Sequence, residues 1–295
     1  MRLTQADLTQ AAEPGGDLQL EEVVGVLAGR RVVVLSGAGM STESGIPDYR
    51  GPDGPRRKAP PIQYRDFILS AATRTRYWAR SAIGWPHFSR ARPNAAHTAV
   101  ARLESSGIVR GVITQNVDRL HQAAGSERVI ELHGALAEAI CMDCGVVEPR
   151  PALQERLLAM NPGWEAEAAA IAPDGDAELP DELIEGFRTP VCLNCAGRLK
   201  PNVVLFGENV PKERVERAFG LVDEAEALLV AGSSLTVYSG FRFVDRASRR
   251  GIAVAIINIG RTRGDLLAAA CAEGKLGALL PKVADKLFAL RRQGR

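Results

Sequence analysis

The sequence predicts an α/β protein in which a doubly wound parallel sheet carries a smaller inserted module. Four short apolar runs are rich in β-branched and aliphatic residues, as strands buried on both faces are. Patterns typical of helices lie between these runs, and alternation of the two favours a parallel sheet. The segment from Cys141 to Leu199 breaks the alternation and is rich in Pro, Gly, Asp and Glu, which indicates the insertion.

The predicted strands each end in polar residues. The strands are Val32–Leu35, Ile108–Thr114, Ala227–Ala231 and Ile252–Ile257, and helices are predicted at Ala95–Ser105 and Phe241–Arg250. The carboxyl ends of parallel strands meet at one edge, where such sheets bind ligands. We therefore expect the four polar ends to surround a ligand.

The composition is that of an ordinary soluble enzyme. Of 295 residues, 46% are hydrophobic and 24% charged, and the net charge of +2 is too small to argue for direct nucleic-acid binding. No apolar run is long enough to span a membrane. Residues 1–20 contain several acids and no apolar core, unlike a secretory or transit peptide, so we expect a flexible N-terminus and a cytoplasmic protein. A chain whose transit peptide had been removed would look the same, and a monomer is the default expectation.

Four of the five cysteines form two CxxC pairs, Cys141/Cys144 and Cys192/Cys195. In a cytosolic chain such pairs indicate a metal more readily than disulfides. The gap between the pairs is much longer than the roughly 15–20 residues of a usual zinc ribbon, so spacing alone leaves four unmetallated thiols open. Cys271 matches no pair and is expected to be a small apolar filler.

The glycine-rich stretch that follows the first strand is ambiguous by itself. Gly37-Ala38-Gly39 begins like a dinucleotide-binding fingerprint, but Thr42 stands where the third glycine belongs. The stretch could cradle phosphates, or it could be an ordinary connection in which Asp48 and Arg50 form a surface ion pair.

The order of motifs is more specific than any one of them. "GAGMSTESGIPDYRG", "TQNVDRLH", "ELHG", the two CxxC pairs, "KPNVVLFGE", "GSSLTV" and "NIG" follow one another along the chain. Over roughly residues 20–290 this order closely resembles the sirtuins, the NAD-dependent protein lysine deacylases. "RYWAR", "PDGD", "LKPNVVLFGE" and "GSSLTVYSG" make the chain most similar to class II. The resemblance implies a Rossmann-like NAD-binding domain over 21–138 and 200–290, and a small module over 139–199 that binds one structural Zn²⁺ through the four cysteines.

The resemblance also implies the residues that bind NAD, the co-substrate. Ala38, Gly39 and Ser41 would cradle its phosphates, and Tyr49 stands where most sirtuins have Phe. The full implied set is Gly37, Ala38, Gly39, Ser41, Ile46, Asp48, Tyr49, Arg50, Gln115, Asn116, Val117, Asp118, Gly232, Ser233, Ser234, Asn258, Ile259, Gly260 and Leu276.

By the same resemblance His133 is the catalytic base, aided by Asn116 and Asp118. An imidazole with a pKa near 6.5 suits this task at neutral pH. Asp118 could instead be only a helix N-cap. His97 and His121 are expected to be structural.

Two segments are implied to bind the acylated lysine of a protein substrate. "VVLFGE" (203–208) is predicted as an edge strand that pairs with the substrate peptide through Val204, Phe206, Gly207 and Glu208, although a plain core strand is the alternative. Tyr77 and Arg80 lie i, i+3 on a predicted helix, as a Tyr and an Arg of class III sirtuins do when they receive acidic acyl groups. Alternatively, Tyr77 packs in the core and Arg80 is solvated.

The leading hypothesis is an NAD-dependent protein lysine deacylase that transfers the acyl group to ADP-ribose and releases nicotinamide. Two alternatives stay open: a protein ADP-ribosyltransferase with weak deacylase activity, and a non-catalytic NAD-sensing interaction protein. The presence of His133, Asn116 and Asp118 argues against the latter.

Overall fold

The computed structural model describes residues 14–49, 61–166, 175, 177 and 179–293. Arg50, one of the expected NAD-binding residues, lies outside these residues, as do residues 1–13 of the predicted flexible N-terminus. Helix α1 begins at Pro14, earlier than the expected boundary. No helix in the described part of the chain is long and apolar enough to cross a membrane.

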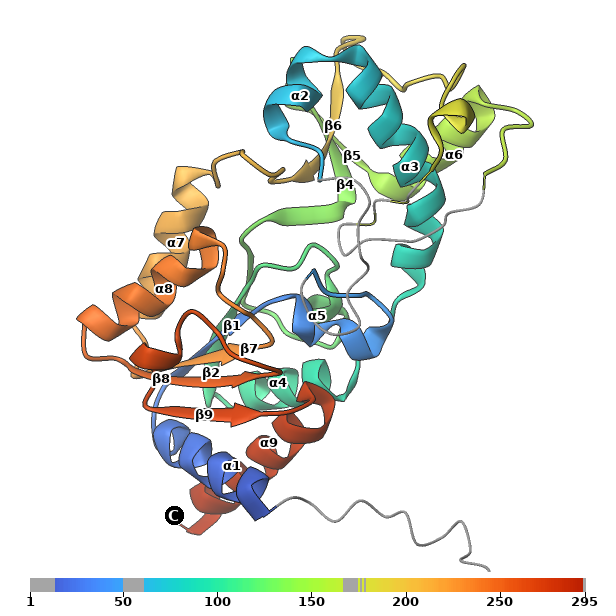
Figure 1. The fold of residues 1–295 in the computed structure, drawn as a ribbon. Helices are drawn as coiled ribbons and strands as arrows, with labels where there is room; N and C mark the ends of the chain where they lie inside the picture. Colours follow the sequence, from blue (N-terminus) through green and yellow to red (C-terminus); the bar gives the residue numbers. More distant parts are fainter. Residues whose placement is uncertain (1–13, 50–60, 167–174, 176, 178, 294–295) are drawn as a thin grey trace, which may run out of the picture.

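The predicted doubly wound parallel sheet is confirmed (Figure 1). Six strands lie in the order β3-β2-β1-β7-β8-β9, and every neighbouring pair is parallel. Their bounds are β1 Val32–Ser36, β2 Val109–Thr114, β3 Val129–Glu131, β7 Ala227–Ala231, β8 Ala253–Asn258 and β9 Ala270–Glu273. The sequence did not predict β3 and β9. Cys271 lies on β9 and is exposed, so its expected role as an apolar filler is wrong.

Helices cover both faces of this sheet. Buried residues of α1 (Pro14–Leu27), α4 (Ala95–Ser105) and α9 (Leu276–Gln293) form one core with one side of the strands. Residues of α7 (Lys212–Asp223) and α8 (Tyr238–Arg249) form a second core with the other side, and Figure 1 shows the two groups on opposite faces. The alternating inward side chains of the strands therefore fix the sheet between two apolar layers.

The smaller module is a three-stranded antiparallel sheet with its own helices. The strands are β5 (Val147–Pro149), β4 (Gly134–Cys141) and β6 (Leu199–Val203), with β4 in the middle. Its core joins α2 (Tyr64–Leu69), α3 (Ala71–Arg90) and α6 (Arg150–Met160), so residues well before the first CxxC pair contribute to it. The division at residues 138 and 200 stays a prediction.

The predicted edge strand over residues 203–208 is wrong in its extent. Strand β6 ends at Val203, and beyond it Phe206 makes a single isolated bridge with Gln63. The Glu208 carboxylate folds this segment into a turn. It accepts from the Leu205 N–H at 2.9 Å and from the Lys200 ammonium at 2.9 Å. Both charged side chains are largely buried, so this ion pair fixes the shape of the segment.

Candidate active site

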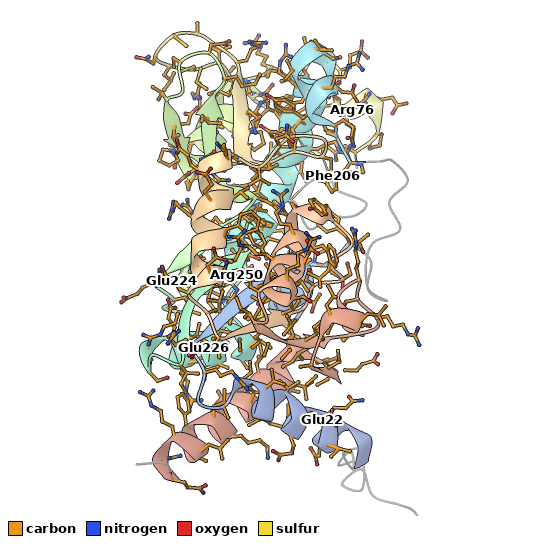
Figure 2. The ribbon with its side chains drawn as sticks, turned by 90° about the vertical axis from the view of Figure 1, so that its left-hand side faces the viewer. Glu22, Arg76, Phe206, Glu224, Glu226 and Arg250 are labelled. Atoms are coloured by element: carbon orange, nitrogen blue, oxygen red, sulfur yellow. The ribbon has the colours of Figure 1, made fainter. Side chains whose placement is uncertain are left out.

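A cavity of about 800 Å³ opens at the carboxyl ends of the strands. Phe206, one of its lining residues, lies a short way below Arg76 of the small module and far above Glu22 of α1 in Figure 2. The lining includes these residues singled out from the sequence: Gly37, Ala38, Gly39, Ser41, Ile46, Asp48, Tyr49, Tyr77, Gln115, Asn116, Val117, Asp118, His133, Val204, Phe206, Gly207, Glu208, Gly232, Ser233, Ser234, Asn258, Ile259 and Gly260. The expectation that the polar strand ends surround one site is met.

Two expected site residues lie away from the cavity lining. Leu276 is buried at the start of α9, against the strands. The Arg80 guanidinium donates through Nε to the Ala177 carbonyl at 2.6 Å. Tyr77 does line the cavity, while its ring also packs edge-on against Phe67 and Trp78. Tyr77 thus fits both its core and its site interpretation.

Glycines let two loops cross in contact at the floor of the cavity. A Cβ on Gly37 would lie 2.8 Å from the Gly232 carbonyl oxygen, and one on Gly232 would lie 2.5 Å from the Met40 nitrogen. Gly232 also has a φ of +63°, which other residues rarely adopt. The glycine pattern therefore serves a close backbone crossing, which leaves the ends of β1 and β7 open toward a ligand.

Asn116, Ser41 and Asp118 form a polar chain on the cavity wall. The Asn116 amide donates through Nδ2 to Ser41 Oγ at 3.0 Å, and Ser41 Oγ donates to Asp118 Oδ2 at 2.6 Å. The other Asp118 oxygen accepts from the Leu120 N–H at the start of α5 (Leu120–Ala123), so this carboxylate also acts as a local cap. Burial raises the pKa of Asp118, and its hydrogen bonds oppose that shift.

The hydrogen bonds of His133 define its tautomer. Its Nδ1 lies 2.9 Å from the Gln115 carbonyl oxygen, which can only accept, so Nδ1 carries the proton. Nε2 is then the basic nitrogen, and the Ser239 hydroxyl donates to it at 2.9 Å. Burial lowers the pKa of His133 to about 4, so the imidazole is neutral at physiological pH. The neutral ring offers its Nε2 lone pair to the cavity, while the lowered pKa makes it a weaker base than a free imidazole.

Gly134 explains why His133 is followed by glycine. Its φ is +81°, and a Cβ there would lie 2.1 Å from the Asn202 carbonyl oxygen on the neighbouring strand. The His133 carbonyl also accepts from the Val204 N–H at 2.8 Å. His133 and the predicted substrate segment are thus joined by one backbone hydrogen bond.

His97 and His121 are fully buried, and neither lines the cavity. Their rings pack at 5.0 Å, and His121 Nε2 lies 2.9 Å from Ser36 Oγ. Burial lowers the pKa of His97 to about 4, and burial with the nearby His97 lowers that of His121 to about 3. Both are therefore neutral structural residues, as expected from the sequence.

Sequence reasoning missed part of α8. Ser239 and Arg242 line the cavity, and Ser239 contacts His133 from a residue more than a hundred positions away. A Cβ on Gly240 would lie 2.4 Å from the Gln115 side chain, so this helix begins in close contact with the cavity wall. Ser239 belongs to the motif "GSSLTVYSG", which could have indicated it, but only Gly232, Ser233 and Ser234 of that motif were predicted to line the site.

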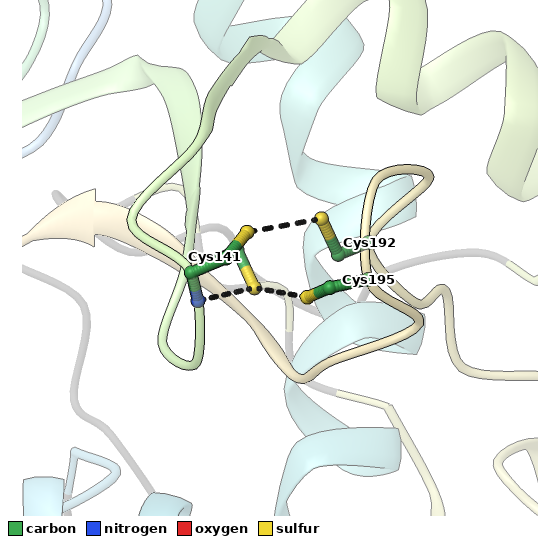
Figure 3. A group of neighbouring side chains, drawn as sticks. Cys141, Cys192 and Cys195 are labelled. Atoms are coloured by element: carbon green, nitrogen blue, oxygen red, sulfur yellow. Dashed lines mark hydrogen bonds between the residues drawn. The ribbon is translucent and has the colours of Figure 1, made fainter.

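The four paired cysteines form one cluster in the small module (Figure 3). The sulfur atoms of Cys141 and Cys195 lie 3.5 Å apart, and those of Cys144 and Cys192 lie 3.7 Å apart. A tetrahedral Zn²⁺ with Zn–S bonds of about 2.3 Å requires sulfurs about 3.8 Å apart, whereas a disulfide requires about 2.05 Å. Backbone N–H groups also point at the sulfurs, since those of Asp143 and Cys144 lie 3.4 Å from Cys141 Sγ. The donor set therefore fits zinc.

Comparison with protein families gives a match to the Sir2 family over residues 37–239, more than half of the chain. The chain belongs to the Sir2 family. This sirtuin is 52% identical over 287 residues to NAD-dependent protein deacetylase 1 of Streptomyces coelicolor, with 97% of this chain and 96% of the relative covered. It is 56% identical over 238 residues to an NAD-dependent protein deacetylase of Xanthomonas axonopodis pv. citri, with 81% of each chain covered.

Solved structures of Sir2 proteins have the same fold. One, described under the structural basis for the mechanism and regulation of Sir2 enzymes, superposes on the sirtuin with a TM-score of 0.74 at 32% identity, covering 93% of this chain and all of the other. A Sir2 complex with a p53 peptide and NAD⁺ superposes with a TM-score of 0.72 at 30% identity, covering 92% and 99%.

Proposed function

We propose that this sirtuin is an NAD-dependent protein deacetylase and deacylase that transfers the acyl group of an acylated lysine to ADP-ribose. The observation that carries the proposal is the neutral His133, whose basic Nε2 faces the same cavity as the chain Asn116–Ser41–Asp118. A base and a polar wall in one large cavity suit a reaction in which a ribose hydroxyl loses its proton. The named relatives support this activity.

The polar groups at the strand ends would orient NAD. Gly37, Ala38 and Gly39 leave the backbone accessible to the phosphates, as glycine-rich turns do. Asn116 and Asp118 would hold the nicotinamide and its ribose. NAD supplies a glycosidic bond whose cleavage releases nicotinamide and leaves the anomeric carbon open to the acyl oxygen. His133 Nε2 would then take the proton of a ribose hydroxyl.

The segment beyond β6 is the proposed docking site for the acylated peptide. Val204, Phe206, Gly207 and Glu208 line the cavity, and its shape is fixed by the pair of Lys200 and Glu208. The Val204 N–H, the Leu205 N–H and the Phe206 carbonyl already have partners within the chain, so a peptide would pair with the remaining backbone groups of this segment. A Zn²⁺ held by the four thiolates of the cysteine cluster would have no open position, so it would stabilise the fold. Membership of class II, a cytoplasmic location and a monomeric state stay predictions.

The test is a product balance with an acetylated peptide and NAD. A deacetylase releases nicotinamide, deacetylated peptide and O-acetyl-ADP-ribose in equal amounts. An ADP-ribosyltransferase would release nicotinamide while the peptide keeps its acetyl group and a protein gains ADP-ribose. An NAD-binding interaction protein would release no nicotinamide. Either of these last results would overturn the proposed function.

A further inference from the structure

The segment that crosses Gly232 contains little regular structure of its own. It consists of two short 3₁₀ turns, η1 (Ala38–Met40) and η2 (Thr42–Ser44), whose backbone bonds close over only three residues. Yet it carries Gly39 and Ser41, two of the proposed NAD contacts. Segments with few long-range backbone bonds keep their shape through contacts with their surroundings. The contacts that hold this segment therefore decide how well the cofactor site is formed.

Asn94 contacts this segment, and it is also the N-cap of α4. Its Oδ1 accepts from the N–H groups of Ala96 at 2.9 Å and His97 at 3.3 Å. Its Nδ2 donates to the Met40 carbonyl at 2.9 Å and to Ser44 Oγ at 3.0 Å. One side chain thus caps a helix with its oxygen and binds both 3₁₀ turns with its nitrogen.

The orientation of the Asn94 amide follows from its partners. The N–H groups of α4 can only donate and the Met40 carbonyl can only accept, so the flipped amide would oppose donor to donor and acceptor to acceptor. The Asn94 N–H also donates to His97 Nδ1 at 3.3 Å, which completes a capping box. Because His97 is fully buried, the cap is held in one position.

A second helix holds the other side of the segment. Glu43 Oε2 accepts from the Gly277 N–H in the first turn of α9 at 2.6 Å, where the helix dipole favours a carboxylate. Helices α4 and α9 pack against each other, and the fully buried Met40 side chain lies in the same core. The N-termini of α4 and α9 therefore both hold residues 38–44 in place.

We propose that Asn94 is a positioning residue for NAD: its Nδ2 holds residues 38–44 in the shape that binds the cofactor. The proposal rests on the proposed NAD site. The Asn94 side chain has two separate roles. Its Oδ1 stabilises α4, whereas its Nδ2 holds the cofactor segment. A variant that keeps the oxygen and loses the nitrogen weakens NAD binding while the cap remains.

Asn94→Asp is that variant, since Asp is a good N-cap and its second oxygen would face the Met40 carbonyl. Losing the donor should raise KM for NAD and Kd for ADP-ribose about 3–10-fold, while kcat at saturating NAD stays within about twofold. KM for the acetylated peptide should not change. Asn94→Ser, which can cap but is too short to reach Met40, should behave in the same way, and it decides the question if Asn94→Asp does not fold.

Ser70→Ala is the matched control, because Ser70 Oγ caps α3 by accepting from the Thr73 N–H at 3.1 Å, away from the cofactor segment. It should lower Tm and leave KM for NAD unchanged. The inference is overturned if Asn94→Asp and Asn94→Ser bind ADP-ribose as the wild type does, or if Ser70→Ala raises KM for NAD equally. A wild type that neither binds ADP-ribose nor deacetylates the peptide would instead contradict the proposed function.

Discussion

The cysteine cluster comes from two short turns, each closed by backbone N–H groups that point at sulfur, whereas the cavity collects its polar groups from strand ends spread over most of the chain. In the cluster, ligand geometry is local to each CxxC pair. In the cavity, it depends on the packing of the whole sheet and of α8. The same fold therefore contains a site whose loss should unfold a module, and a site whose loss should stop chemistry and leave the fold intact.

The largest effect is expected from removing a zinc ligand. Cys144→Ser or Cys192→Ser leaves three thiolates, so zinc is lost and the free energy of unfolding falls by at least about 3 kcal/mol. The measurements are zinc content and urea unfolding. Cys271→Ser is the matched control, because this exposed cysteine lies on β9, outside the cluster. A variant that stays active and stable without zinc would contradict a structural role for the zinc site.

A smaller effect, confined to activity, is expected in the cavity wall. Asp118→Ala removes the acceptor of the short bond from Ser41, so kcat/KM for NAD should fall about 10–100-fold. Asn116→Ala should act in the same direction. Initial rates at varied NAD test this, with Asp285→Ala, an exposed carboxylate on α9, as control. If kcat/KM for NAD is unchanged in both Asp118→Ala and Asn116→Ala, these residues do not bind NAD.

Stability should depend on pH through the buried histidines. Burial lowers the pKa values of His97 and His133 to about 4 and that of His121 to about 3, below the ordinary value of 6.5. The unfolded chain therefore binds more protons once the pH falls below 6.5, and stability present above that pH is lost as the pH falls toward 4. The slope should reach at most about 1.4 kcal/mol per pH unit for each histidine. Urea unfolding at pH 5 to 8 checks this; a flat profile would show that none of the three histidines is buried as described.

The smallest expected effect concerns the acyl group. If Tyr77 and Arg80 receive acidic acyl chains, glutaryl-lysine peptides should be turned over at least as well as acetyl-lysine peptides, and Arg80→Met should lose the acidic substrates selectively by about 3–10-fold. Catalytic efficiency on matched peptides is the measurement. Equal loss on both substrates would assign Arg80 to the structure, in keeping with its bond to the Ala177 carbonyl.

Much of the sheet could be predicted, because buried parallel strands are continuous apolar runs. Strand β7 has the predicted bounds, β1 and β2 differ by one residue at one end, and β8 differs by one residue at each end. Strands β3 and β9 have only three and four residues and include charged side chains, so no such run marks them. The cavity residues were predicted from family motifs, while the contact between Ser239 and His133 depends on how α8 packs, which no local pattern records.

The proposed role of His133 as the catalytic base is tested most directly by a joint assay of His133→Ala. Zinc content and ADP-ribose binding should match the wild type, because His133 takes no part in the cysteine cluster or the apolar cores, and Tm should fall only slightly through the loss of its bonds to Gln115 and Ser239. Deacetylation should fall by at least about 10²-fold, the usual contribution of a general base. If the variant deacetylates within about threefold of the wild type, the chemistry does not depend on His133 and the central claim is wrong.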